Sequence, residues 1–262
     1  AVGLVQDGDR IGFGGGNALW RRPLAVTREL VRAGARDLRV CNMIGGLEID
    51  MLLGAGCVAE TNCCHLALDE FGQSEHLQRA ARDGSVQIRE WSEFTFVAAL
   101  RAAGMGLSFL PWRTAWGSDV ARLQRWATVT CPYEGTEMLA VPALDLDVAV
   151  IHAVQADAAG NVALADPPDF IHDYDLIVAR AARCVIVSAE RVAPIEDATR
   201  IALIGREVDC VVEAPHGAWP GGVASQYGVD GEHMGREYVP ATASPEAFRA
   251  YLGRFVHGGE PA

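Results

Sequence analysis

Two stretches in the second half of the chain decide the fold class: VAVIH at 148–152 and CVIVSA at 184–189. Both are apolar at nearly every position, as strands are when helices cover both faces of their sheet. Between them, residues 176–182 have helical spacing. A strand, a helix and a second strand in this order predict a parallel pair joined by a crossover helix.

The same alternation continues outward through the rest of the chain. Gly34 and Gly84 each follow a helical pattern, where a left-handed residue commonly ends a helix. No linker, repeat or low-complexity stretch interrupts the pattern. The sequence therefore predicts an α/β protein with an open, mainly parallel sheet, helices on both faces, and one domain over residues 1–262. Further strands are expected at 11–16, 38–44, 58–63, 86–90 and 208–213, and further helices at 23–33, 49–55, 75–83, 94–105 and 244–255.

Composition excludes several classes of function. The 262 residues are 50% hydrophobic and carry a net charge of −12, so neither nucleic acid nor an anionic membrane surface is an expected partner. No apolar run approaches the ~20 residues of a membrane span. All 22 basic residues are Arg, which excludes Schiff-base chemistry and a Walker-type phosphate loop, because both need Lys.

The cysteines indicate a reducing compartment. There are seven, an odd number, and Ala1–Asp9 has neither the basic segment nor the apolar run of a signal peptide. Reduced thiols in a cytoplasmic protein are therefore expected. Cys63-Cys64-His65 is the one cluster, and it lacks a second pair at zinc spacing, so no metal site is predicted.

In open α/β sheets, ligands bind beyond the carboxyl ends of the strands. The loop Gly14-Gly15-Gly16-Asn17 follows the first predicted strand, and its glycines would let backbone N–H groups approach a ligand oxygen. A dinucleotide fingerprint is one alternative, but position 17 is Asn where the third glycine belongs. A tight turn without a ligand is the other.

Three arginines near predicted loops are candidate anion contacts. Arg21 and Arg22 precede Pro23 and a helix, a position that suits a carboxylate or phosphate; the alternative is a solvated pair. Arg113 lies in a loop between Trp112 and Trp116, where it is either a ligand clamp or a structural stack.

Glu93 is the acid with the clearest catalytic potential. It lies between a predicted strand and an apolar helix, so a favourable place in the first helical turn would explain it. Partial burial beside Trp91 and Phe94 would instead raise its pKa and make it a general acid or base. His152, at a strand end, is expected to be a satisfied core residue, and no Gly-x-Ser-x-Gly elbow is present.

The block VPALDLDVAVIHAVQADAAGNV at 141–162 resembles the α subunit of class I CoA transferases of the glutaconate CoA-transferase type. Supporting segments are Asp7-Gly8, GLSFLP at 106–111, Gly117-Ser118 and VDCVVEAPHGA at 208–218. The resemblance covers nearly the whole chain in order and implies the CoA-transferase (NagB/RpiA-like) fold. The glycine loop departs locally, since Gly16 stands where the family has Phe and Pro23 falls one residue late.

The resemblance implies a partner and a substrate. The α and β subunits of this family share a fold, form an α₂β₂ heterotetramer and place the active site between them. A glutamate of the β subunit, within a Glu-Asn-Gly-like motif that this chain lacks, attacks the acyl-CoA in a ping-pong reaction. No bound cofactor is implied, since the coenzyme A thioester is the substrate. The α subunit would contribute Gly14, Gly15, Asn17, Arg21 or Arg22, and Asn62.

Glu93 introduces a second possibility. The segments 89–93, 109–113 and 117–120 are similar to the α subunit of the steroid-ring-opening acyl-CoA hydrolase, in which an acid of this segment is the catalytic base. An acyl-CoA decarboxylase is a further relative on the scaffold, so fold alone does not set the reaction. Three functions stay open: a CoA transferase subunit for a short or ring-derived acid, a hydrolase subunit using Glu93, and a small-molecule binding or sensor domain.

Overall fold

The computed structural model describes residues 1–224 and 226–258. A central sheet runs in the order β11-β10-β8-β1-β2-β3-β4, every adjacent pair in this order is parallel, and β9 pairs antiparallel with β8. This confirms the α/β prediction. The strands are β1 (Arg10–Phe13), β2 (Leu38–Gly45), β3 (Val58–Leu66), β4 (Gln87–Glu90), β8 (Leu146–Ala156), β9 (Val162–Ala163), β10 (Ala182–Val192) and β11 (Cys210–Glu213).

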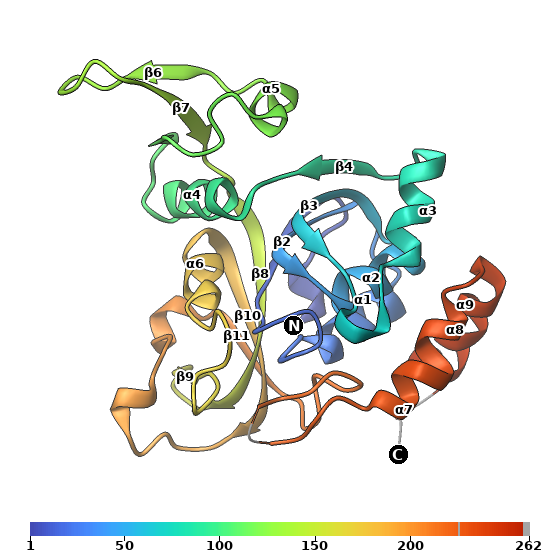
Figure 1. Ribbon diagram of the computed structural model, residues 1–262. Coiled ribbons are helices and arrows are strands. Elements are labelled where there is room, and N and C mark those ends of the chain that lie inside the picture. Colours follow the sequence, from blue (N-terminus) through green and yellow to red (C-terminus); the bar gives the residue numbers. More distant parts are fainter. Residues whose placement is uncertain (225, 259–262) are drawn as a thin grey trace.

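Helices cover both faces of the sheet (Figure 1). Strand β8 illustrates this burial on both faces, because its side chains alternate between two apolar clusters. Val148 and Val150 pack into the first cluster, and Ala149 and Ile151 pack into the second. The first cluster lies under α1 (Leu24–Ala33), α2 (Leu47–Gly54), α3 (Glu75–Asp83) and α9 (Pro245–Leu252), and the second under α4 (Glu93–Gly104) and α6 (Tyr174–Arg180). No helix within the described residues is long and apolar enough to cross a membrane.

The direction of winding reverses between β1 and β8, which are neighbours in the sheet. The chain leaves β1 for α1 on one face and leaves β8 for α6 on the other. Such a switch point opens a crevice at the carboxyl ends of the strands, where ligands commonly bind in open α/β sheets. The loops that follow β1 and β8 are therefore a candidate site.

A small extension was not predicted from the sequence. Residues 109–142 form a second, antiparallel sheet of β5 (Phe109–Trp112), β6 (Thr128–Thr130) and β7 (Glu137–Pro142), with α5 (Asp119–Gln124) beside it. It stands beyond α4 at the top of the view in Figure 1. Its strands are short and mix exposed with half-buried or buried positions, so they lack the apolar runs that identify the strands of the central sheet.

The C-terminal segment is fixed to α2 through a buried carboxylate. It comprises α7 (Gly231–His233), α8 (Val239–Ala241) and α9, and the predicted helix over 244–255 continues past α9 as a π-helical turn, Gly253–His257. Asp50 of α2 accepts hydrogen bonds from Ser74 Oγ and, at 2.7 Å, from Tyr238 Oη. Burial raises the pKa of the Asp50 carboxyl, so these donors stabilise a charge that is costly to bury.

Replacing Tyr238 by Phe is therefore expected to lower the free energy of unfolding by about 1–3 kcal/mol, because one oxygen of the buried Asp50 loses its donor. Chemical denaturation measures the change. Tyr133→Phe is the control, since Tyr133 is 94% exposed and the same deletion there should leave stability unchanged. Equal effects of the two substitutions would contradict this account.

Candidate active site

The glycine loop after β1 is packed tightly against two carboxylates, one from the segment that precedes α6 and one from the first turn of α6. A Cβ atom on Gly14 would lie 1.9 Å from Asp175 Oδ1, and one on Gly16 would lie 2.6 Å from Asp169 Oδ2. Gly15 has φ +131°, a conformation that side chains disfavour. These contacts and this conformation explain why positions 14, 15 and 16 are glycine, and the explanation needs no ligand.

The backbone donors of this loop are used inside the protein. Gly14 N donates to Val150 O at 2.9 Å, Gly15 N to Asp175 Oδ1 at 3.0 Å, and Gly16 N to Trp20 O at 3.0 Å. The expectation that they point at a ligand oxygen is therefore corrected: strand β1 ends at Phe13, and the three N–H groups bond to β8, α6 and Trp20, which fits the alternative of a tight turn without a ligand. The half-buried Asn17 likewise uses its Oδ1 to accept from Ala18 N.

Arg21 is completely buried at the switch point. Its Nε lies 2.7 Å from Asp169 Oδ2, its Nη2 lies 2.6 Å from Asp175 Oδ2, and its Nη1 donates to His152 O at 2.8 Å. Burial by itself lowers the pKa of this guanidinium, but Asp175 and Asp169 outweigh it and raise the pKa above its ordinary value. Arg21 therefore carries a permanent charge that joins the two loops of the switch point.

Arg22 is buried beside it and holds the ends of two further strands. It donates to Asn17 O, Gly14 O and Ile44 O, and its Nη1 lies 3.3 Å from Glu48 Oε1. Burial raises the pKa of the Glu48 carboxyl more than Arg22 lowers it. Glu48 Oε2 has no hydrogen-bond partner among the described residues.

The sequence interpretation of Arg21 and Arg22 thus needs correction. Neither is a solvated pair, and neither guanidinium reaches the surface to receive a substrate carboxylate. Asp169 and Asp175, the partners of Arg21, lie more than 140 residues away along the chain, so no local pattern reveals these contacts. A partial signal existed for one of them, since Asp175 directly precedes the predicted helix at 176–182.

Glu93 has the opposite character, because its side chain is exposed at the carboxyl edge of the sheet. It is the first residue of α4, and Ser92 caps the helix by accepting from Thr95 N at 3.3 Å. The expected partial burial between Trp91 and Phe94 is absent from this arrangement: Trp91 is buried, whereas Phe94 is 66% exposed. Glu93 is therefore a carboxylate within reach of a ligand or a second subunit.

Glu93 lies close enough to the end of β3 to influence Cys64 electrostatically. Burial raises the pKa of the Cys64 thiol, and the charges of Cys63 and Glu93 raise it further, so Cys64 is an uncharged neighbour of Glu93 at neutral pH. A cavity of about 160 Å³ lies alongside, between β3, β4 and α3, and Cys64, His65 and Glu90 help to line it. Within residues 1–224 and 226–258, no group of three or more His, Cys, Asp or Glu side chains is placed to hold a metal ion.

Asn62 lies beneath this edge, with both amide atoms occupied. Its Nδ2 donates to Glu60 Oε1 at 2.8 Å and its Oδ1 accepts from Trp91 Nε1 at 3.2 Å. At 1% exposed it supports Trp91, two residues before Glu93, and does not form a wall of an open pocket.

Arg113 is placed away from the glycine loop, directly after β5 in the extension. Its guanidinium is exposed and paired with Glu134 of the same extension. The structure therefore brings together Asn62 and Glu93 at one edge and the glycine loop with Arg21 and Arg22 at another place, while Arg113 belongs to neither.

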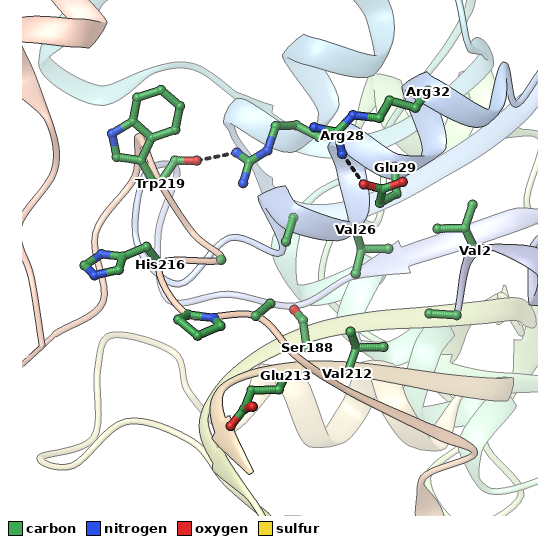
Figure 2. A pocket seen from close by; sticks show the side chains of 15 residues that line it. Val2, Val26, Arg28, Glu29, Arg32, Ser188, Val212, Glu213, His216 and Trp219 are labelled. Atoms are coloured by element: carbon green, nitrogen blue, oxygen red, sulfur yellow. Dashed lines mark hydrogen bonds and ion pairs between the residues drawn. The ribbon is translucent and has the colours of Figure 1, made fainter. Parts of the chain in front are cut away.

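A groove of about 700 Å³ runs between α1 and the ends of β10 and β11 (Figure 2). The Arg and Glu side chains along it already have partners, since Arg28 donates to Trp219 O at 2.6 Å, Arg32 pairs with Glu29, and Glu213 accepts from Val192 N. Glu93 is not part of its lining. The groove and the Glu93 edge are therefore separate features.

A polar network around His152 fixes the loop that follows β11. His152 Nε2 lies 2.7 Å from Glu190 Oε1, which also accepts from Tyr227 Oη at 2.6 Å, while Glu190 Oε2 accepts from His216 N. His152 is fully buried, as expected of a satisfied core histidine, and Ser188 Oγ lies 2.8 Å from its Nδ1.

This network predicts a stability that declines in acid. Burial lowers the pKa of His152, so the unfolded chain binds its proton first as the pH falls below about 6.5. Burial works to raise the pKa of Glu190, but hydrogen bonds from His152 and Tyr227 outweigh it and lower the pKa. Glu190 therefore contributes stability above its unfolded pKa of about 4.3, and this contribution disappears as the pH falls through the folded value.

Glu190→Gln measures the second contribution. The wild type should be more stable than this variant at pH 7, and the difference should shrink as the pH falls below about 4.3. Denaturation of both proteins over a pH series provides the comparison. A difference that stays constant from pH 7 to pH 3.5 would contradict the assignment.

Comparison with known proteins agrees with this architecture. The family model for coenzyme A transferase matches residues 1–205. The chain belongs to the coenzyme A transferase family. The resemblance noted from the sequence is thereby confirmed, and so is its fold.

Several proteins similar to this coenzyme A transferase family chain are enzymes of known activity. The IpdA subunit of a cholesterol ring-cleaving hydrolase from Rhodococcus jostii is 32% identical over 99% of this chain and 90% of its own length. The crystal structure of glutaconate coenzyme A-transferase from Acidaminococcus fermentans is matched with a TM-score of 0.88 and 28% identity, over 98% of this chain and 86% of that one. A variant of the decarboxylase AibA/AibB is matched with a TM-score of 0.86 and 34% identity, over 97% and 95%.

Proposed function

We propose that this chain is the α subunit of a two-subunit enzyme that acts on an acyl-CoA thioester, and that Glu93 is the acid–base group it contributes. The observation that carries the proposal is the position of Glu93, exposed in the first turn of α4 at the carboxyl edge of the sheet. The similar enzymes include a hydrolase and a decarboxylase, and neither reaction is transfer of coenzyme A to an acceptor acid.

The reaction that uses this carboxylate most directly is hydrolytic opening of a cyclic acyl-CoA that carries a ring ketone. Glu93 takes a proton from water as the water oxygen bonds to the ketone carbon. The bond from that carbon to its ring neighbour then breaks, and its electron pair passes to the neighbouring carbon. Glu93 returns the proton there, so water is consumed, one carboxylic acid is formed, and the enzyme is unchanged.

Transfer of coenzyme A is the second candidate. It is supported by the glutaconate enzyme, whose α subunit is 29% identical over 96% of this chain. Residues 1–262 contain no Glu-Asn-Gly sequence, so the nucleophilic carboxylate would have to lie on the β subunit. Glu93 would then serve only as a neighbour of that carboxylate.

Isotope labelling separates the two reactions. The chain, co-expressed with a β-type partner from the same organism, is incubated in ¹⁸O-water with cyclic and straight-chain acyl-CoA thioesters. Hydrolysis by way of Glu93 places one ¹⁸O in a new carboxylate and leaves no adduct on either chain. A coenzyme A adduct on the β subunit that an acceptor acid removes would overturn this proposal in favour of transfer. Binding without turnover would indicate a sensor domain.

The setting we propose follows from the same relatives. Residues 1–262 would act as one domain within an α₂β₂ heterotetramer, in catabolism. The seven cysteines, which are all free, are consistent with a cytoplasmic location. Acyl-CoA is then the one small-molecule partner, and no nucleic acid or membrane takes part.

A further inference from the structure

The turn that carries Glu93 is held from outside by the extension. Trp126, which follows α5, lies against Trp91 with a ring-centroid distance of 5.3 Å and an interplanar angle of 45°. Gln124 Nε2, near the end of α5, donates to Glu90 O at 2.9 Å. Glu90 and Trp91 are the last residues before Ser92 and Glu93, so both contacts fall on the β4–α4 turn.

The geometry of α5 explains how these two side chains reach the turn. The helix is followed by Arg125, whose φ of +54° places it in the left-handed region. The chain therefore reverses there, and Trp126 N donates back to Ala121 O. This reversal brings Trp126 beside Gln124, while Leu123 of the same helix is 67% exposed.

The inner side of the same turn is held by the central sheet. Asn62 Oδ1 accepts from Trp91 Nε1, and Glu60 accepts from both Asn62 Nδ2 and Arg89 Nε. Trp91 therefore lies between a buried polar row on β3 and the ring of Trp126. Its orientation depends on both sides, and the extension supplies one of them.

The extension is itself anchored on α4, the helix that Glu93 begins. Leu139 and Val141 of β7 are buried in the same cluster as Phe96 of α4, and just beyond the extension Leu144 N donates to Ala99 O at 3.0 Å. The extension thus packs against α4 and also contacts the turn in front of it. An element fixed at both places sets where the first residue of α4 points.

We propose that residues 109–142 are a positioning arm for Glu93, with Gln124 and Trp126 as its positioning residues. The inference rests on the proposed function, since it concerns the orientation of the same carboxylate. Neither residue touches the substrate in this account. They act through Glu90 and Trp91, and their loss should displace the carboxylate without weakening thioester binding.

The test uses the two-subunit enzyme with the cyclic acyl-CoA that it opens fastest. Gln124→Glu removes the donor to Glu90 O, and Trp126→Leu removes the ring on Trp91, with Trp126→Phe as the conservative partner. Each of the first two should lower kcat about tenfold or more while KM changes less than about twofold. Arg122→Gln, on the same helix but 70% exposed, is the control and should retain full activity.

A double-mutant cycle separates positioning from general damage. In a Glu93→Gln enzyme, Trp126→Leu should cause no further loss of kcat, because the group it positions is gone. Losses that multiply in the double variant, or an unchanged kcat in Trp126→Leu, would overturn the inference. A Glu93→Gln enzyme with wild-type turnover would instead refute the proposed function, and the inference with it.

A structural measurement on the isolated chain completes the test. Two indole rings 5.3 Å apart interact, so the wild type should show an exciton couplet in its circular dichroism spectrum. Trp126→Leu should abolish this signal while the rest of the spectrum stays native, and Gln124→Glu should weaken it. A couplet that Trp126→Leu leaves intact would show that the two rings do not stack in solution and would overturn the inference.

Discussion

Glu93→Gln should reduce turnover of the assembled enzyme by about 10²–10⁴-fold, the range that removal of a general acid–base group produces. The amide keeps the size of the side chain and its place in the first turn of α4. It accepts no proton from water at neutral pH, so the first step stops. Steady-state kinetics with the acyl-CoA substrate measures the loss, which should fall on kcat with little change in KM.

Glu246→Gln is the matched control for this prediction. Glu246 also lies in the first turn of a helix, two residues after the capping Ser244, and its side chain is 74% exposed. The two substitutions remove the same favourable charge at a helix N-terminus. Equal turnover in the two variants would mean that Glu93 serves only its helix, and the proposed chemistry would then be wrong.

Arg21→Met should lower the free energy of unfolding by about 3–5 kcal/mol, because it leaves buried carboxylates without their counter-charge. Asp175 is completely buried and Asp169 is 7% exposed, so water does not replace the lost guanidinium. Chemical denaturation compares the variant with the wild type. If Arg21→Met does not fold, Arg21→Lys retains the charge but lacks the planar fork, and should fold with a smaller loss.

Arg236→Met is the control for the buried pair. Arg236 is 77% exposed and pairs with Glu232 on the surface, so its replacement should change stability by no more than about 0.5 kcal/mol. A loss below about 1 kcal/mol for Arg21→Met would contradict the view that its ion pairs hold the switch point together.

The sequence predicted the parts of the fold that depend on local pattern. The apolar runs at 148–152 and 184–189 lie within β8 and β10, which pair in parallel, and Gly34 and Gly84 end their helices with positive φ as expected. A strand that is buried on both faces is apolar at nearly every position, so it can be recognised from its own residues without knowledge of the strands beside it. The extension left no such signal, because its strands are short and none of them is buried on both faces.

The candidate site was predictable only in part. Glu93 was recognised because a carboxylate between a strand and an apolar helix is a local feature. The roles of Arg21 and Gly14 depend on Asp175, which is distant in the sequence, so the local pattern offered a ligand contact, a tight turn or a solvated pair but not this buried ion pair. Trp126 was missed for the same reason, since its contact with Trp91 joins two segments whose pairing only the fold establishes.

The extension has a further consequence for the divergence of such enzymes. The chain enters and leaves it at adjoining points, where Ala143 N donates to Ser108 O at 3.0 Å. An insert whose two ends already touch can be exchanged for another of different length without reopening the parallel sheet. Because this insert also contacts the turn that carries Glu93, a single exchange would alter the setting of the carboxylate while the scaffold stays the same. In chimaeras that exchange residues 109–142 between relatives, the reactivity should therefore follow the exchanged segment.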